Sequence, residues 1–227
     1  MVDVRIFIFN NSLKQVEIPY FRAVVSKHLG GDVLLHNHTE SGLRNKLPLI
    51  QYKIIQGKPA IVAINEGIAV VEPILDLGEI SVNIGKRPMR LKIDSVWGNQ
   101  FEVCITEQKY KYSLENWISF NEENYATYKK TESIIERLNL ITSILKSNIL
   151  SFAKGVGFFF DKQIELSISD ISAPKNIAYK GTKLMTFDVT FTCNVCLPEY
   201  IGLGKGVSRG YGMLTLKNYM NYGAKTE

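Results

Sequence analysis

The sequence predicts an α+β protein with an approximate internal duplication. The first half shows the order strand, helix, strand, strand, helix, strand, which is the order of a ferredoxin-like unit. The second half repeats alternating strand patterns around one long helical pattern. A glycine-rich segment near the C-terminus precedes the last expected strand. These three observations define the fold class.

The first half is expected to form a domain over residues 1–85. Residues 4–9 are β-branched and aromatic, which is typical of a buried strand. Pro19 begins a helix whose apolar residues follow helical spacing, and Gly30 and Gly31 end it. The remaining elements are expected over 48–55, 58–63, 66–77 and 80–84.

The second half, residues 86–227, is expected to form the other domain. Its long helix is predicted over 131–150, where isoleucine and leucine recur at helical spacing. Its strands alternate apolar and polar residues, with Gly98 and Asn99 predicted to form a turn between the first two. These strands are expected over 89–96, 101–106, 164–171, 183–195 and 213–216.

Composition and charge indicate an ordinary globular protein that could bind an acidic partner. The chain has 227 residues, of which 45% are apolar and 22% charged, and its net charge is +5. A mildly basic balance permits nucleic acid as a partner without requiring it. The N-terminus does not resemble a signal peptide, and no apolar run approaches the ~20 residues that span a bilayer. We therefore expect a cytoplasmic protein that does not enter a membrane.

The cysteines indicate a reducing compartment rather than a disulfide framework. There are three, Cys104, Cys193 and Cys196, and an odd number cannot be fully paired within the chain. Cys193 and Cys196 form a lone CxxC, and a zinc site would need two further ligands, such as Cys104 and a histidine. The pair lies in a strand-like run where thiols are common core residues, so we expect no metal and no cofactor.

The segment from Gly202 to Gly212 contains five glycines in eleven residues, with cations between them. It is not a P-loop, because Gly206 follows Lys205 where serine or threonine is required. It is not a dinucleotide fingerprint either, because Val207 replaces the third glycine and only fifteen residues follow Gly212. Two interpretations stay open: a turn between strands, or a backbone that cradles phosphates.

The spacing of this segment resembles the glycine-rich loop of the CRISPR-associated RAMP proteins, in particular the repeat-cleaving endoribonuclease Cas six. The match covers a Gly-apolar-Gly pair, five residues that include cations, a second such pair, and the position near the C-terminus. The resemblance implies two ferredoxin-like (RRM-like) halves side by side, the C-terminal one irregular. It also implies that the segment contacts RNA. The expected RNA-binding residues are Gly202, Gly204, Lys205, Gly206, Ser208, Arg209, Gly210 and Gly212.

A second basic cluster lies at the start of the second half. Lys86, Arg87 and Arg90 fall in one short segment without an acidic residue. Such clusters are often only solvated surface, but we include these three among the expected RNA-binding residues.

All three histidines lie within eleven positions, and histidine is the usual side chain for moving protons near neutral pH. His28 falls on the predicted helix, where a packed or surface imidazole is the better interpretation. His36 and His38 are two residues apart, so they would share a face in an extended segment, which suits an acid–base pair. A pair of metal ligands is the alternative.

The resemblance favours catalysis for this segment. In the repeat-cleaving family, a histidine from the N-terminal half commonly serves as general acid or base. Residues 48–53 also resemble the strand that follows this segment in one branch of that family. The expected catalytic residues are therefore His38, which we prefer, His36, and as assistants Tyr52 and Lys53. Strand alternation allows only one of Tyr52 and Lys53 to face the site.

The predicted function is a metal-independent endoribonuclease that binds CRISPR precursor RNA and cleaves within its repeats. Attack by the 2′-hydroxyl would give guide RNAs with 2′,3′-cyclic phosphate ends. One alternative is a non-catalytic RAMP subunit that binds guide RNA in a CRISPR effector complex, and a weaker one is an RNA-binding module of unrelated role. The implied partners are CRISPR repeat RNA and, as further candidates, effector complex subunits and a second copy of the chain.

Overall fold

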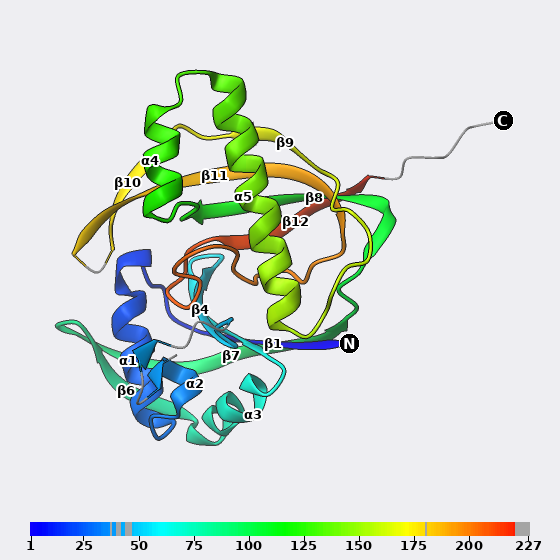
Figure 1. The fold of residues 1–227 in the computed structure, drawn as a ribbon. Coiled ribbons are helices and arrows are strands. Elements are labelled where there is room, and N and C mark those ends of the chain that lie inside the picture. The colour runs from blue at the N-terminus through cyan, green and yellow to red at the C-terminus, as the bar shows by residue number, and fades with distance from the viewer. Residues whose placement is uncertain (37, 40–41, 44–46, 180, 221–227) are drawn as a thin grey trace. The chain divides into compact units, whose positions relative to one another are not determined.

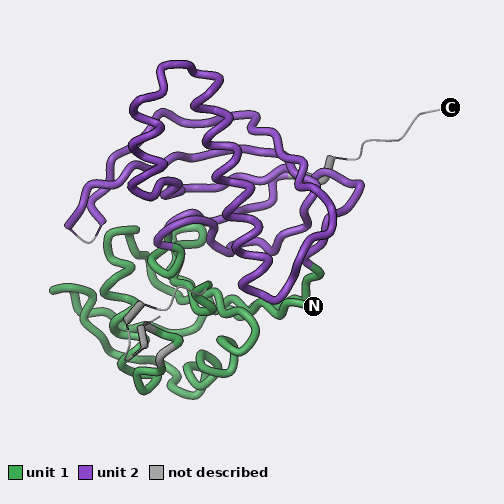
Figure 2. The backbone as a smooth tube through the Cα atoms, viewed as in Figure 1, with its two compact units in different colours: residues 1–102, 207–210 green, residues 103–206, 211–227 purple. Residues whose placement is uncertain are grey.

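The computed structural model describes residues 1–36, 38–39, 42–43, 47–179 and 181–220, and the chain divides into two compact units (Figures 1 and 2). Unit 1 contains residues 1–102 and 207–210, and unit 2 contains residues 103–206 and 211–227. Each unit is built on its own antiparallel sheet, with helices beside it. The predicted α+β class, with one sheet in each half, is confirmed.

Unit 1 has a five-stranded sheet in the order β4-β5-β1-β7-β6, with β1 at its centre. Strand β1 pairs with β5 and β7, so the first strand of the chain holds both halves of the sheet together. The strands are β1 (Val2–Phe9), β4 (Ile50–Ile55), β5 (Lys58–Ile64), β6 (Glu79–Ile84) and β7 (Arg87–Phe101). The other elements of unit 1 are η1 (Gln15–Glu17), α1 (Ile18–His28), α2 (Val33–His36), β2 (His38–Thr39), β3 (Gly42–Leu43), α3 (Gly67–Val71) and η2 (Glu72–Leu77).

The boundary between the units differs from the expected position near residue 85, and β7 is the reason. The sequence predicted a turn at Gly98 and Asn99, but one strand of 15 residues runs through both positions. Gly98 pairs directly with Arg5 of β1, so cross-strand pairing keeps the backbone extended there although glycine is unfavourable inside a strand. Strand β7 therefore completes the sheet of unit 1.

Helix α1 packs on one face of this sheet through aromatic side chains. Phe21 makes edge-to-face contacts with Phe9 of β1 at 5.1 Å and with Tyr52 of β4 at 5.8 Å between ring centroids. Such pairs are stabilising beyond the area they bury. The core continues along the same face through Phe7 and Ile61, both fully buried. The helix is thereby fixed against β1 and β4.

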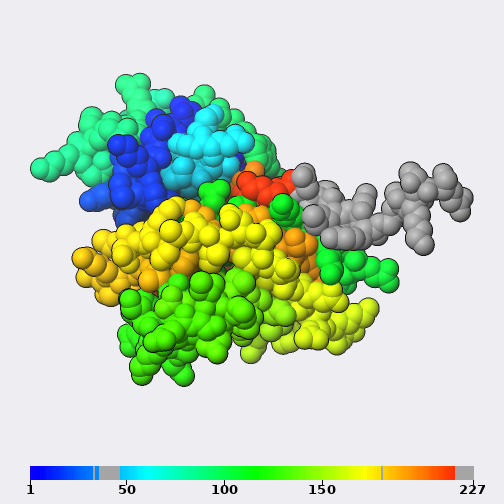
Figure 3. Space-filling model, turned by 90° about the horizontal axis from the view of Figure 1, so that it is seen from above, coloured from blue at the N-terminus to red at the C-terminus, as the bar shows by residue number. Residues whose placement is uncertain are grey.

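Unit 2 has a sheet in the order β10-β11-β8-β12, with β9 also paired to β11. Its strands are β8 (Ile105–Trp117), β9 (Leu166–Ile171), β10 (Lys175–Tyr179), β11 (Thr182–Val195) and β12 (Met213–Met220). Its helices are α4 (Glu122–Lys130) and α5 (Ile134–Gly155). Figure 1 shows α5 crossing this sheet, and Figure 3 shows the helices (green) and β9 (yellow) at the surface.

Helix α5 begins at a serine that caps its first turn. A hydrogen bond from a buried tryptophan side chain fixes the helix further along. The Ser133 hydroxyl accepts a hydrogen bond from the Glu136 backbone N–H, which satisfies one of the unpaired donors at the helix start. Along the helix, Asn148 accepts a hydrogen bond of 2.9 Å from the indole N–H of Trp117 in β8. Trp117 is fully buried, so its polar group needs this partner.

None of the helices in the described ranges combines the length and apolar character that a membrane crossing requires.

The two ends of the glycine-rich segment, which we call the glycine loop (residues 202–212), pair with each other in unit 2. Leu203 N–H donates to Gly212 O at 2.9 Å, and Gly212 N–H donates to Asn116 O at 3.2 Å. Gly212 has a φ of 60°, and a Cβ there would collide with the Leu203 carbonyl oxygen. The loop closes because this position has no side chain.

We predict that Gly212→Ala lowers the free energy of unfolding far more than Gly157→Ala does. Both glycines have positive φ, but a Cβ at Gly157 meets nothing within 4 Å. The control should therefore show only backbone strain, about 1–3 kcal/mol, whereas Gly212→Ala adds the collision. Urea denaturation of both variants measures the difference. Equal losses of unfolding free energy in the two variants would show that backbone strain at positive φ, and not the collision, accounts for the effect of Gly212→Ala.

Candidate functional site

The middle of the glycine loop, residues 207–210, packs within unit 1, and we call it the loop tip. It lies along β4, which is an edge strand of the sheet, with a parallel bridge between Arg209 and Tyr52. The Gln15 side chain donates a hydrogen bond of 3.1 Å to Arg209 O. An edge strand needs cover for its unpaired backbone groups, and the loop tip provides it.

Gly210 fixes how closely the loop tip approaches α1. Its φ is 88°, and a Cβ there would overlap the Ile18 side chain and lie 2.6 Å from Gln15 Nε2. Ile18 is fully buried, so its terminal methyl group has little room to shift. The glycine at this position is therefore favoured both by its positive φ and by packing within unit 1.

Lys53 of β4 is fully buried, and its amine donates a hydrogen bond of 3.1 Å to Val207 O in the loop tip. Burial lowers the pKa of Lys53 to about 7, because a buried ammonium loses its hydration. The amine thus titrates in the range where general acids and bases operate. A role of Lys53 in proton transfer stays a prediction.

Tyr52, the neighbour of Lys53, is also fully buried, in the core beneath α1. Burial raises the pKa of its phenol. The Arg22 guanidinium lies 6.0 Å from its ring centroid, and no hydrogen-bond partner for its hydroxyl is found among the described residues. Tyr52 and Lys53 lie on opposite faces of β4, as strand alternation predicts. A catalytic role for either stays a prediction.

The histidine segment follows α2 in unit 1. His36 is the last residue of α2, and His38 begins β2, which pairs with β3 through His38 and Leu43. The condition under which the two histidines would share a face, an extended segment, does not hold at His36, where a helix ends. Alternation therefore does not place the two imidazoles on a common face. Asn37 and the side chains of His36 and His38 lie outside the described part of the structure.

Arg22 of α1 holds the helix that ends in His36. Its guanidinium is buried and donates a hydrogen bond of 3.1 Å from Nε to Leu35 O, one residue before His36. The same guanidinium lies over the Tyr52 ring, and Tyr52 bridges to Arg209. A continuous series of contacts in unit 1 thus runs from the histidine segment to the loop tip.

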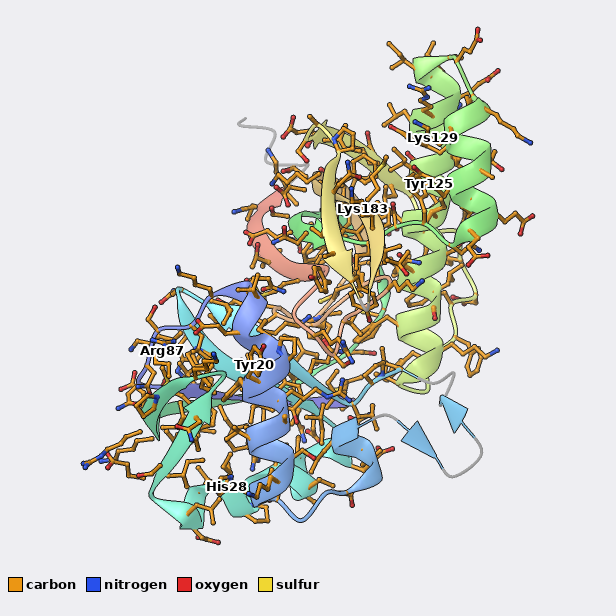
Figure 4. All side chains as sticks on the ribbon, turned by 90° about the vertical axis from the view of Figure 1, so that its left-hand side faces the viewer. Tyr20, His28, Arg87, Tyr125, Lys129 and Lys183 are labelled. Atoms are coloured by element: carbon orange, nitrogen blue, oxygen red, sulfur yellow. The ribbon has the colours of Figure 1, made fainter. Side chains whose placement is uncertain are left out.

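His28 is an exposed residue at the end of α1, with Nδ1 2.9 Å from Val24 O. The sequence favoured a packed or surface imidazole at His28 over a catalytic one, and His28 lies at the surface. Figure 4 shows it at the C-terminal end of the helix.

The other expected RNA-binding residues of the loop divide between the units. Gly204 and Gly206 belong to unit 2 and have φ of 87° and 77°. Gly202 bridges to Met213, and Lys205 is exposed, with its backbone N–H donating to Ile118 O at 3.1 Å. In the loop tip, Ser208 and Arg209 are half-buried. The contribution of these residues to RNA binding stays a prediction.

The second basic cluster is not at the loop tip. Lys86, Arg87 and Arg90 lie on the hairpin of β6 and β7, at the edge of the sheet opposite β4. All three are exposed; Arg87 pairs with Glu17 at 2.8 Å and Arg90 with Glu79 at 3.4 Å. Exposed ion pairs of this kind contribute little to stability, so these cations can exchange partners.

The cysteines form no metal site within the described ranges, where no group of three or more histidine, cysteine or acidic side chains could hold an ion. Cys193 is buried, and burial raises the pKa of its thiol to about 12. Cys196 N–H donates a backbone hydrogen bond of 2.9 Å to Cys104 O.

Sequence reasoning missed two residues that organise the site, Gln15 and Arg22. Arg22 carried a signal, because it occupies a core-facing position with Ile18 and Val25 at helical spacing. Gln15 carried none, because its partner Arg209 is 194 residues away.

We predict that the free energy of unfolding of the wild type, minus that of Lys53→Met, rises between pH 7 and pH 10. The pKa of Lys53 is near 7 when folded and 10.5 ordinarily, so in this range the unfolded chain binds the additional proton. Stability then increases with pH by up to about 1.4 kcal/mol per pH unit. Methionine fills similar space without titrating. Denaturation of both proteins across this pH range measures the difference, and parallel profiles would contradict it.

Comparisons with known proteins cover nearly the whole described chain. A crystal structure of Cas6b is 26% identical, with a TM-score of 0.85 over 96% of this chain and 100% of that one. A crystal structure of the CRISPR RNA processing endoribonuclease Cas6b is 23% identical, with a TM-score of 0.73 over the same shares of the two chains. At this identity, the match supports the fold alone. An uncharacterized protein of Methanocaldococcus jannaschii is 29% identical over 143 residues, which are 60% of this chain and 95% of that protein.

The two halves of the chain match models of the two domains of one protein family. Residues 4–102 match the model of the Cas6b N-terminal domain, and residues 104–216 match that of the Cas6b C-terminal domain. The predicted relationship to the Cas six proteins is therefore confirmed. On these matches, the chain belongs to the Cas6b family.

Proposed function

We propose that this chain is an endoribonuclease that binds CRISPR precursor RNA and cleaves it within the repeats. The proposal is supported by its membership of the Cas6b family and by a similar fold described as a CRISPR RNA processing endoribonuclease. The structural observation that carries it is the series of contacts through Arg22, Tyr52 and Arg209, which joins the histidine segment to the glycine loop. The histidine segment and the loop tip are thereby linked through one residue of β4, Tyr52.

The proposed reaction uses the nucleophile that RNA itself carries. One histidine, His36 or His38, removes the proton of the 2′-hydroxyl beside the scissile phosphate, and that oxygen attacks phosphorus. The bond to the 5′-oxygen breaks as an acid gives this oxygen a proton. The products are a 2′,3′-cyclic phosphate and a 5′-hydroxyl end, and no metal ion takes part.

The remaining expected residues stabilise and position the RNA. Lys205 and Arg209 offset the negative charge that develops on the phosphate, and the glycines allow the strand to lie close to the backbone. Lys53, whose amine titrates near neutral pH, assists by holding the loop tip or by proton exchange. The reaction takes place in the cytoplasm, and the partners beyond RNA are effector complex subunits and a second copy of the chain.

The first test replaces both histidines by alanine. Cleavage of repeat RNA should fall by about 10²- to 10⁴-fold for each acid–base group lost. The affinity for the same RNA should change little, because the imidazoles act on protons rather than on phosphate charge. Single-turnover cleavage and filter binding measure the two quantities. Full activity in the double variant would assign the proton transfers to other groups.

The second test places one 2′-deoxynucleotide at the cleavage position, in buffer with EDTA. The modified RNA should bind as tightly as the unmodified one and stay intact, because the nucleophile is missing. The unmodified RNA should be cut at one position in the same buffer. Cutting of the deoxy substrate, or a requirement for Mg²⁺, would show that water is the attacking group.

A further inference from the structure

Two of the three cysteines of unit 2 lie directly opposite each other at the ends of two paired strands, β8 and β11 (Figure 1). Cys104 directly precedes β8, and Cys196 directly follows β11. The Cys196 backbone N–H donates a hydrogen bond of 2.9 Å to Cys104 O, one position beyond the pair of Val195 and Ile105. Antiparallel residues joined by such a bond are direct partners, and their side chains project from the same face. The two thiols therefore share one face at this end of the sheet.

The side chain of Tyr110 in β8 lies near both thiols. Burial raises the pKa of Tyr110, and the thiols of Cys196 and Cys104 act in the same direction. The Cys196 thiol is also within hydrogen-bonding reach of the Tyr110 hydroxyl. A single hydroxyl close to both thiols supports the placement that the backbone pairing indicates.

The spacing of such a pair fits a strained disulfide. Direct partners with hydrogen-bonded backbones have Cα atoms about 5.5 Å apart, and disulfides join Cα atoms about 4.4–6.8 Å apart. The Cβ atoms of such partners are about 4.5–5.5 Å apart, whereas a disulfide requires about 3.5–4.5 Å. The two strand ends must therefore approach each other by about 1 Å to form the bond. Strained disulfides are reduced more easily than relaxed ones, so this bond would be reversible.

Other partners fit these thiols less well. Cys193 lies three residues before Cys196 at the extended end of β11, which separates their Cα atoms by about 10 Å, beyond the reach of a disulfide. Burial also raises the pKa of the Cys193 thiol to about 12, so its reactive thiolate is scarce. A shared metal is not supported, because no suitable group of ligands is found in the part of the chain that the structure describes. Cys104 and Cys196 are only half-buried, so a small oxidant can reach them.

We propose that Cys104 and Cys196 form a reversible disulfide within the chain when the protein meets hydrogen peroxide. The thiolate of one cysteine attacks a peroxide oxygen, the O–O bond breaks, and the departing hydroxide takes up the thiol proton as water. The thiolate of the other cysteine attacks the resulting sulfenic sulfur and releases a second water. The two sulfurs together give two electrons to the peroxide.

The bond would link the two ends of a large part of unit 2. The segment between the two cysteines contains β8, α4, α5, β9, β10 and β11. The glycine loop begins at Gly202, six positions after Cys196. In a reducing compartment the pair stays as thiols, and a cross-link of this kind is transient. The inference does not depend on the proposed function.

The test treats the chain with hydrogen peroxide, blocks the remaining thiols by alkylation and identifies the products by mass spectrometry. The intact chain should lose two hydrogen atoms, the peptides that contain Cys104 and Cys196 should be joined, and dithiothreitol should restore both thiols. Cys193→Ala is the matched control, because it removes the third thiol and should form the same bond. Cys104→Ser and Cys196→Ser should each form no bond, and dimedone should trap the sulfenic acid of the cysteine that remains.

Three results would overturn the proposal: oxygen adducts without the bond, a bond to Cys193, or a bond between two chains. A second measurement tests reversibility by equilibrating oxidised Cys193→Ala with mixtures of reduced and oxidised glutathione. The pair should change between its two states within the range of cytosolic glutathione mixtures, because the bond is strained and accessible. A bond that persists in fully reduced glutathione would be a permanent structural disulfide and would contradict the inference. Since no measurement involves RNA, an inactive nuclease would leave this result unaffected.

Discussion

The edge of β4, which no other strand of the sheet pairs with, is the constraint on which the arrangement of unit 1 depends. A sheet edge presents backbone groups that need partners, and residues 207–210 of the glycine loop cover this one. The approach is close enough that Gly210 has no space for a side chain beside Ile18. It also gives the buried amine of Lys53 an acceptor at Val207 O. Without the loop tip, a buried polar group and a strand edge would both lack these partners.

The same strand connects this packing to the proposed chemistry. Tyr52 faces the core beneath α1, and the guanidinium of Arg22 lies between its ring and the backbone of α2. A shift of β4 would therefore disturb the guanidinium that holds the helix ending in His36. We infer that the glycine loop and the histidine segment, 160 residues and more apart in sequence, depend on one another through a single strand.

The sequence predicted regular elements well where periodicity was strong, as in α1, β4 and β11, because local pattern determines such elements. It failed at Gly98, where glycine was interpreted as a turn although pairing with Arg5 keeps the strand extended. Among the site residues, the burial of Lys53 could not have been predicted, since lysine is normally exposed and its acceptor lies 154 residues away. Long-range partners of this kind leave no local pattern.

Of the two interpretations of the glycine loop, the turn is carried by particular glycines, and the phosphate cradle stays a prediction. Gly212 is required by packing, because a Cβ there would collide with the Leu203 carbonyl oxygen, whereas Gly210 is favoured by its positive φ and by the side chains of Ile18 and Gln15 beside it. Lys205, in contrast, is exposed and contributes its backbone to pairing with Ile118, which leaves its side chain available to a phosphate. The glycines of this chain are therefore explained by packing and backbone conformation without RNA. The proposed contacts with RNA depend on the cations between them, Lys205 and Arg209, and their replacement tests the proposal more directly than replacement of the glycines.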